Sequence, residues 1–351
     1  MSAPARVLVT GHLGYLGPPV VAALHRAGHE VAGLDSGLFE DCALEPDPPV
    51  PTIRRDIRDV TPADLRGVHA VVHLAGLSND PLGLLAPDLT HEINAAATLR
   101  LATAAREAGV RRFLFSSSCS VYGTTAEAWV DEATPPRPVT PYAAAKAAAE
   151  RGLAGLAGPA FCVLSLRNAT AFGYSPRLRT DLVVNDLVAG AVLRNEIRLL
   201  SDGSAWRPLV HVSDLARAFA LALDAPAEHV NGAVLNVGAD AQNYTVRTIA
   251  RTVAEALPEA RLSIPGDAGR DVRSYRVRFD RLHRLLPEFA CRVDLRAGIA
   301  DLVAQYRRVG LRSTDGCVRL EHLKRRLAAG EVAADLRPRL PAPAAAAAAG
   351  A

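Results

Sequence analysis

Between residues 5 and 167, short apolar runs rich in β-branched residues alternate with alanine-rich segments of helical length. The apolar runs predict strands, and they occupy residues 6–10, 30–34, 51–55, 70–75, 112–117 and 161–167. In the segments between them, apolar residues recur three or four positions apart, which is the spacing of helices that cover a sheet. The alternation predicts an α/β fold in which a doubly wound parallel sheet carries crossover helices on both faces.

After residue 167 the alternation gives way to two further helical segments, several short strands and loops rich in arginine. We therefore predict a first domain over residues 5–167, with a returning segment near 208–225, and a smaller α/β substrate-binding domain over 168–310. The last stretch, residues 330–351, is rich in alanine and proline. It is predicted to be a disordered tail outside the fold.

Charge and cysteine usage exclude several classes of partner. The 40 Lys and Arg are interspersed with 37 Asp and Glu, so no nucleic-acid partner is expected. No apolar run approaches the roughly 20 residues of a membrane span, and the N-terminus leads into a predicted strand without a signal-like region. We expect a cytoplasmic protein with no membrane partner. The 5 cysteines are scattered without the spacing of metal ligands, which predicts reduced thiols and no metal site.

Three glycines, Gly11, Gly14 and Gly17, follow the first predicted strand and begin the first predicted helix. Glycine is needed there because the chain turns sharply and its backbone must approach a pyrophosphate, which the helix N-terminus stabilises. Asp35 ends the second predicted strand, where a carboxylate accepts hydrogen bonds from the adenosine ribose hydroxyls. A carboxylate there repels a 2′-phosphate, so the predicted cofactor is NAD.

The glycine spacing G-x-x-G-x-x-G resembles that of the short-chain dehydrogenase/reductase superfamily, which has a Rossmann-like fold. "RRDIRD" resembles its adenine-edge segment, and "VHLAG" resembles the stretch that passes along the cofactor. Asn94 matches a helix asparagine that braces the active site. The resemblance spans roughly residues 5–310. The cofactor contacts that it implies are Gly11, Gly14, Tyr15, Leu16, Gly17, Asp35, Asp56, Ile57, Leu74, Ala75, Gly76, Asn94, Tyr142 and Lys146.

Tyr142 and Lys146 stand four apart in "YAAAK", a spacing that in isolation more often marks a solvated pair. The fifth predicted strand ends in "FSSSCSVYG", which places Ser118 at the carboxyl edge of the sheet. Together the three residues resemble the Ser–Tyr–Lys catalytic triad of the extended branch of this superfamily. A tyrosine base needs its pKa lowered by about three units from ~10. We expect Lys146 and the positively charged nicotinamide to supply that shift, with Ser118 holding the substrate oxygen.

The extended branch includes nucleotide-sugar epimerases, 4,6-dehydratases, decarboxylases and ketoreductases. The 4,6-dehydratases carry Thr-Asp-Glu where this chain has Ser118-Cys119-Ser120, so the missing carboxylates count against dehydration. A C4 epimerase needs only the triad and is the leading hypothesis. A dehydratase or a net oxidoreductase remains an alternative, and so does a non-catalytic dinucleotide sensor. The 3,5-epimerases use a cysteine one position later in this loop, so Cys119 is either a candidate acid/base or a small buried residue.

The resemblance also implies a nucleotide diphosphate sugar as substrate. "GSAWRPLVHVSDLARA" matches the segment that places Arg207 on the ligand, with His211 and Asp214 behind it, and a second cation is expected from Arg270 or Arg273. The loop residues could equally form salt-bridged surface loops. The predicted substrate residues are Ser78, Asn79, Ser118, Asn168, Thr170, Arg177, Arg179, Asn185, Arg207 and Arg273. Helices over 93–109 and 140–158 resemble those that pair two subunits in this branch, which predicts a homodimer.

Overall fold

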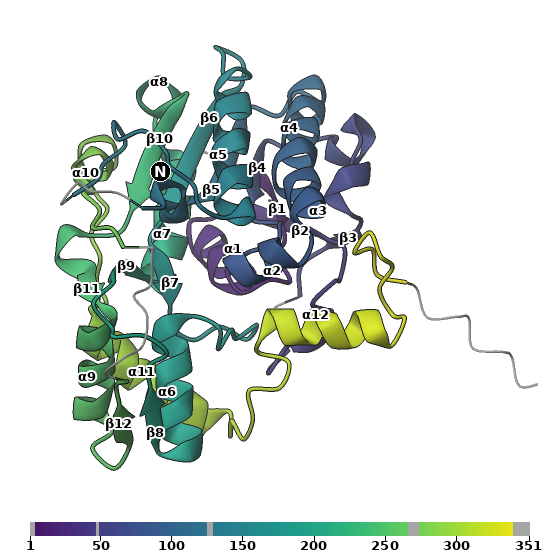
Figure 1. Cartoon of the computed structure of the whole chain (residues 1–351). Helices are drawn as coiled ribbons and strands as arrows, with labels where there is room; N and C mark the ends of the chain where they lie inside the picture. The colour runs from purple at the N-terminus through teal and green to yellow at the C-terminus, as the bar shows by residue number, and fades with distance from the viewer. Residues whose placement is uncertain (1–3, 47–48, 125–128, 266–273, 340–351) are drawn as a thin grey trace, which may run out of the picture.

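The structure is a computed structural model that describes residues 4–46, 49–124, 129–265 and 274–339. Its largest element is a seven-stranded parallel sheet with the strand order β10-β6-β5-β4-β1-β2-β3 (Figure 1). The strands are β1 (Arg6–Thr10), β2 (Glu30–Asp35), β3 (Thr52–Arg54), β4 (Ala70–His73), β5 (Arg112–Ser118), β6 (Cys162–Asn168) and β10 (Ala233–Val237). The order reverses between β1 and β4, and this switch point opens a crevice at the carboxyl ends of the strands.

Helices cover both faces of this sheet, and each face has its own apolar core. On one face α1 packs against α7, and Val20, Leu24, Leu215 and Phe219 meet there. On the other face α4 and α5 lie side by side (Figure 1). The helices are α1 (Gly17–Arg26), α4 (Ala97–Glu107), α5 (Pro141–Ala154) and α7 (Val212–Asp224). The predicted doubly wound, Rossmann-like α/β fold is confirmed.

A second group of elements below the sheet in Figure 1 has a separate core. A three-stranded sheet of order β11-β9-β7 and a two-stranded sheet of β12 and β8 pack with α6, α9 and α11. These elements are β7 (Thr170–Phe172), α6 (Val183–Arg194), β8 (Glu196–Arg198), β9 (Trp206–His211), β11 (Asn243–Thr245), α9 (Val246–Ala256), β12 (Arg261–Ser263) and α11 (Leu295–Arg308). β9 belongs to the small sheet, whereas β10, which the sequence analysis did not predict, completes the large one.

Shorter elements connect these parts. The α-helices are α2 (Asp80–Leu85), α3 (Pro87–His91), α8 (Ala227–Val230), α10 (Asp280–Leu285) and α12 (Arg319–Ala328), and Glu92–Ala96 forms a π-helical turn. Single turns of 3₁₀-helix are Glu40–Cys42, Ile57–Asp59, Pro62–Leu65, Cys119–Tyr122 and Asp240–Gln242. Within the described ranges, no helix is long and apolar enough to cross a bilayer.

The predicted tail begins too early. Residues 330–339 are folded: Val332 and Leu336 are buried, and Val332 forms an isolated bridge with Pro338. Val332 and Leu336 belong to the large domain's apolar cluster, and their burial helps to hold this stretch in place. The prediction of a disordered tail is therefore wrong for residues 330–339, while residues 340–351 lie outside the described part of the chain.

Candidate active site

A cavity of about 800 Å³ lies at the carboxyl ends of the parallel strands. By the strand order, its wall runs from Asp56 and Asp35, which follow β3 and β2, past the glycine loop after β1, to Ser118 at the end of β5 and to Tyr142. From there it continues to the second group of elements, where Arg207 contributes. This is the position at which doubly wound sheets bind their ligands.

The glycine loop fits a dinucleotide. Gly11 has φ +73°, and a Cβ there would lie 2.6 Å from the Ala75 backbone nitrogen, so a side chain would close the gap between the loops after β1 and β4. A Cβ at Gly17 would lie 1.9 Å from the His12 carbonyl oxygen. The loop is thus held open by the absence of side chains, and it leads into the N-terminus of α1. Such a backbone cradle suits a pyrophosphate.

Both predicted carboxylates of the adenosine end line the cavity, and both have partners within the protein. Asp35 accepts hydrogen bonds from the backbone nitrogens of Leu13, at 3.1 Å, and Gly37, at 2.8 Å. Burial raises the pKa of Asp35, while these two hydrogen bonds act in the opposite direction. For Asp56, burial opposes ionisation, but the hydrogen bonds from Arg58 outweigh it and hold the pKa below its usual value.

The structure brings Ser118, Tyr142 and Lys146 together. Ser118 ends β5, and Thr140 caps the N-terminus of α5 by accepting a hydrogen bond from the Ala143 backbone nitrogen at 3.2 Å. The cap starts the helix so that Tyr142 reaches Ser118, to which its hydroxyl is hydrogen-bonded. The Lys146 Nζ lies one turn further on, 5.9 Å from the centroid of the Tyr142 ring, and it donates to the Ser116 carbonyl oxygen at 2.7 Å.

Desolvation controls the ionisation of this cluster. Burial raises the pKa of Tyr142 to about 12, although the Ser118 hydrogen bond and the charge of Arg179 act to lower it. Burial lowers the pKa of Lys146 to about 8, against the opposing effect of Glu150. The net shift of Tyr142 is thus opposite to the one expected from Lys146. The physical reason is that burial away from water destabilises the charged forms of both groups, the phenolate and the ammonium.

Behind the triad lies a buried ion pair. The Arg167 guanidinium donates to the Glu150 carboxylate, with 2.8 Å between Nη2 and Oε2, and both side chains are 5% exposed. Glu150 also accepts a hydrogen bond from Ser117, and Arg167 donates to the Tyr122 hydroxyl at 3.1 Å. Glu150 follows Lys146 by one helical turn, so the pair ties α5 to β5 and β6 directly beneath the site.

Cys119 is not part of the cavity wall in the described structure. Its side chain is 1% exposed, and its Sγ donates to the Arg167 carbonyl oxygen at 3.2 Å. Burial raises the pKa of the thiol. Of the two interpretations of Cys119, this placement agrees with a small buried residue behind the serine rather than with an acid/base.

The predicted substrate residues divide into two groups. Those that line the cavity are Ser78, Asn79, Ser118, Asn168, Thr170, Arg179 and Arg207. Two others act from behind: Arg177 donates to the Glu40 carbonyl oxygen, and Asn185 donates to the Arg179 carbonyl oxygen at 2.9 Å. Asn94, assigned to the cofactor, likewise braces the Leu77 backbone through both its amide nitrogen and oxygen. Arg270 and Arg273 lie outside the described residues.

Three carboxylates in the cavity wall escaped the sequence analysis, Asp80, Asp181 and Asp186. Burial raises the pKa of Asp186. Asp80 accepts a hydrogen bond from the Thr140 hydroxyl at 2.6 Å, and its charge raises the pKa of Tyr142. Asp181 accepts from the Asn79 amide at 2.6 Å and from Arg179 Nε at 2.8 Å. "SNDP" shows an N-cap followed by proline, but no sequence pattern indicates that this helix start faces Tyr142.

The fold and cavity define a Rossmann-like protein with a Ser–Tyr–Lys cluster at the carboxyl edge of its sheet. Residues 7–238 match the NAD dependent epimerase/dehydratase family. The chain belongs to this family, which confirms the resemblance to the extended short-chain dehydrogenases/reductases and NAD as the cofactor.

Similar proteins agree with this family. The chain is 34% identical over 254 residues to a UDP-glucose 4-epimerase of Mycolicibacterium smegmatis, covering 68% of this chain and 79% of that protein. Its structure is similar to that of MoeE5 in complex with UDP-glucuronic acid and NAD, with 30% identity, a TM-score of 0.75, and 86% and 99% of the two chains covered. It is also similar to DesIV, a dTDP-glucose 4,6-dehydratase from Streptomyces venezuelae solved with NAD and TYD, with 26% identity, a TM-score of 0.74, and 86% and 97% covered.

Proposed function

We propose that this protein is an NAD-dependent nucleotide-sugar epimerase that inverts C4 of a nucleoside diphosphate hexose through a transient 4-keto sugar. The observation that carries the proposal is the cluster of Ser118, Tyr142 and Lys146 in the wall of one cavity, which the glycine loop and Arg207 also line. The 4-epimerases among its relatives support it.

The side chains of the cluster have distinct roles in this reaction. Tyr142 takes the proton of the C4 hydroxyl, and Ser118 holds that oxygen by a hydrogen bond. When bound, NAD supplies a reversible hydride acceptor and a positive ring. Since burial alone keeps Tyr142 protonated at neutral pH, proton transfer needs positive charge beside the phenol, and Lys146 and Arg179 contribute theirs from the protein side. After the ketone has turned over in the site, hydride returns to its other face and Tyr142 gives the proton back to the C4 oxygen, which completes the inversion.

The diphosphate would bind where Arg198 and Arg207 line the cavity. Arg179 lines it as well and lies close enough to Tyr142 for their charges to interact. Guanidinium groups suit a diphosphate because each donates two parallel hydrogen bonds. The sugar would then lie between the triad and these arginines.

A dehydratase is the second candidate. The loop after β5 has no carboxylate, but other segments supply carboxylates to the same cavity. Asp80 lies close enough to Tyr142 to shift its pKa, and Asp181 lines the same cavity. Elimination of water from a keto sugar needs both a base and a proton donor. Epimerisation is preferred because it needs no group beyond the triad, and because two of the three carboxylates, Asp80 and Asp181, already accept hydrogen bonds from Thr140 and Arg179.

The experiment is incubation of the purified protein with a panel of nucleoside diphosphate sugars in D₂O, followed by chromatography, mass spectrometry and absorbance at 340 nm. An isomer without loss of water or net formation of NADH supports the epimerase. Loss of water supports the dehydratase, and stoichiometric NADH supports an oxidoreductase. Absence of any turnover despite NAD binding favours the non-catalytic sensor. Tyr142→Phe is the matched control, since it keeps the ring that packs in the wall.

We also propose that the protein forms a homodimer through α4 and α5, which lie side by side on one face of the sheet (Figure 1). Ala144 is an exposed small residue on α5, and small side chains permit close approach of helices. Sedimentation of the wild-type protein beside Ala144→Arg tests the interface. A dimer that the variant converts to monomer supports it, and a wild-type monomer contradicts it.

A further inference from the structure

The C-terminal part of the described chain reaches back to the cofactor end of the cavity. We name residues 318–339, which comprise α12 and the turn after it, the C-terminal strap. Figure 1 shows α12 beneath α2 and β3, at the carboxyl edge of the large sheet, and α12 packs against α2. The strap lies beyond residue 238, where the family match ends. Three of its residues, Val318, Arg319 and Leu336, line the cavity.

Apolar packing fixes the strap to the loops that follow β2 and β3. Leu323 and Leu336 are buried in the same cluster as Leu38 and Ile57, of which Leu38 and Ile57 also line the cavity. The Arg319 guanidinium lies 5.6 Å from the centroid of the Phe39 ring. The strap and these two loops thus enclose one end of the cavity, the end marked by Asp35 and Asp56.

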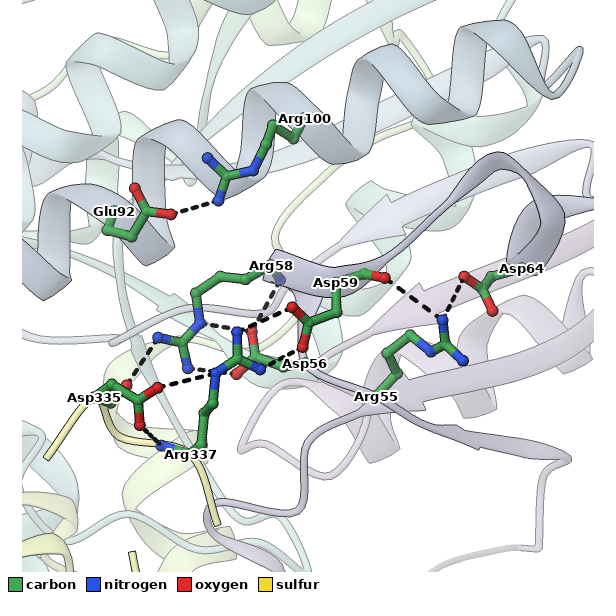
Figure 2. A network of polar contacts seen from close by, with 9 residues as sticks. All are labelled: Arg55, Asp56, Arg58, Asp59, Asp64, Glu92, Arg100, Asp335 and Arg337. Carbon is green, nitrogen blue, oxygen red and sulfur yellow. Dashed lines mark hydrogen bonds and ion pairs between the residues drawn. The ribbon is translucent and has the colours of Figure 1, made fainter. Parts of the chain in front are cut away.

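Charged contacts fasten the outer edge of the strap to the loop after β3 (Figure 2). Arg337 pairs with Asp59 and with Asp335, and Arg58 donates to the Asp335 carbonyl oxygen at 2.8 Å. Arg58 holds the Asp56 carboxylate at the same time, with 2.7 Å between Nη2 and Oδ2. The contact network therefore runs without interruption from a residue of the cavity wall to the strap.

A second fastening joins α12 to the loop after β2. Arg326 donates to the Leu38 carbonyl oxygen at 2.8 Å and lies 3.4 Å from the Asp41 carboxylate. Asp41 is 56% exposed and the Asp59 and Arg337 side chains are 50% and 37% exposed, so water and salt screen these pairs. Each pair is individually weak, which makes the fastening reversible.

The backbone of Leu336 is held in an uncommon conformation. Its φ is +64°, a left-handed value that residues with a side chain rarely adopt, and yet its side chain is 4% exposed. The surrounding contacts must stabilise this conformation, since it costs energy by itself. Its effect is to hold an apolar side chain against the cavity wall beside Ile57.

We propose that the strap is part of the NAD site: Leu336 packs against the adenosine half of the dinucleotide, and the contacts of Arg337 and Arg326 hold the strap closed over it. A ligand enclosed in this way leaves only when the strap is released, so the strap slows cofactor exchange. Slow exchange suits a reaction in which the same cofactor is oxidised and reduced in every turnover. The inference rests on NAD as the cofactor and not on which sugar reaction takes place.

Release of NADH from the full-length protein tests the strap. The protein is loaded with NADH, excess NAD is added, and the decay of the bound NADH fluorescence is followed at about 0.05 M and about 0.5 M salt. For the wild type we expect slow release that accelerates severalfold with salt. Arg337→Ala should release NADH roughly fivefold faster at low salt and respond little to added salt. Leu336→Ala should release it about tenfold faster at both salt concentrations, because its contact is apolar.

Arg296→Ala is the matched control. Arg296 pairs with Glu255 at an exposed position between α11 and α9, and neither residue belongs to the strap or lines the cavity. It should release NADH like the wild type, and thermal denaturation of each variant reports whether it is folded. Equal release rates in the wild type, Arg337→Ala and Leu336→Ala overturn the proposal. Because no sugar is present, a failure of the proposed epimerase activity leaves this outcome unaffected.

Discussion

The floor and the cover of the cavity are built in different ways. The floor, formed by the loops after β1, β2, β4 and β5 and by the start of α5, is held by parallel strand pairing and a capped helix. The cover, formed by residues 173–182 and the C-terminal strap, combines apolar packing with arginines that reach across the fold to carbonyl oxygens and a serine hydroxyl. From this difference we expect chemistry at the floor and ligand retention at the cover.

The largest effect on the floor is expected for Tyr142→Phe. Removal of the hydroxyl that accepts the substrate proton should lower kcat by about 10³-fold. Bound NAD should remain, because the glycine loop and Asp35 are untouched. Steady-state kinetics together with the cofactor content of the purified variant test this. A variant that keeps more than a tenth of the activity would show that another group is the base.

The next effect concerns the stability of the floor. Arg167→Met leaves Glu150 buried without its partner, which should lower the free energy of unfolding by about 3–5 kcal/mol. Chemical denaturation measures this effect. Arg167→Met combined with Glu150→Gln should recover much of the loss, and equal instability of the single and double variants would contradict the argument.

The pH dependence of kcat tests whether the charge of Lys146 supports the ionised form of Tyr142. Lys146 carries its charge below its pKa of about 8, so its support for the Tyr142 phenolate, and with it the activity, should decline as the pH rises past about 8. Lys146→Met removes this charge at every pH, so the decline near pH 8 should disappear, with kcat near pH 7 lower by roughly 10²-fold. Lys146→Arg is the control that keeps the charge. A decline near pH 8 that persists in Lys146→Met would exclude Lys146 from this role.

In the cover, Arg179→Lys should have a moderate effect of a different kind. The guanidinium binds Asp181 through two nitrogens and the Ser78 hydroxyl at 2.9 Å, a fork that lysine cannot reproduce. We expect KM for the sugar nucleotide to rise about tenfold with a much smaller change in kcat. A fall in kcat without a change in KM would show that Arg179 acts in catalysis rather than in substrate binding.

The smallest effect is expected for Cys119→Ala. The thiol lies behind the serine and outside the cavity wall, so kcat should stay within about twofold of the wild type. Kinetics beside Ser118→Ala, the neighbouring position that does line the cavity, provide the comparison. A loss of kcat as large as that of Ser118→Ala would show that Cys119 takes part in catalysis.

The sequence by itself determined the parts of this protein that are local. The sheet follows from strand–loop–helix units whose apolar periods are visible in the sequence, and the offsets of glycine, aspartate and tyrosine indicated which residues would line one cavity. The desolvation that raises the pKa of Tyr142 could not be predicted in this way, because it is a property of the assembled cavity.

Only the tertiary structure decided which distant segments meet. β10 joins the large sheet, Asp80 lies beside Tyr142, and Leu336 reaches the cavity from the far end of the chain. These contacts follow no sequence period and no fixed spacing. An arginine or leucine at any point in the sequence can make them once the packed core brings it close. Packing of the apolar clusters fixes those positions, and packing is a property of the whole fold.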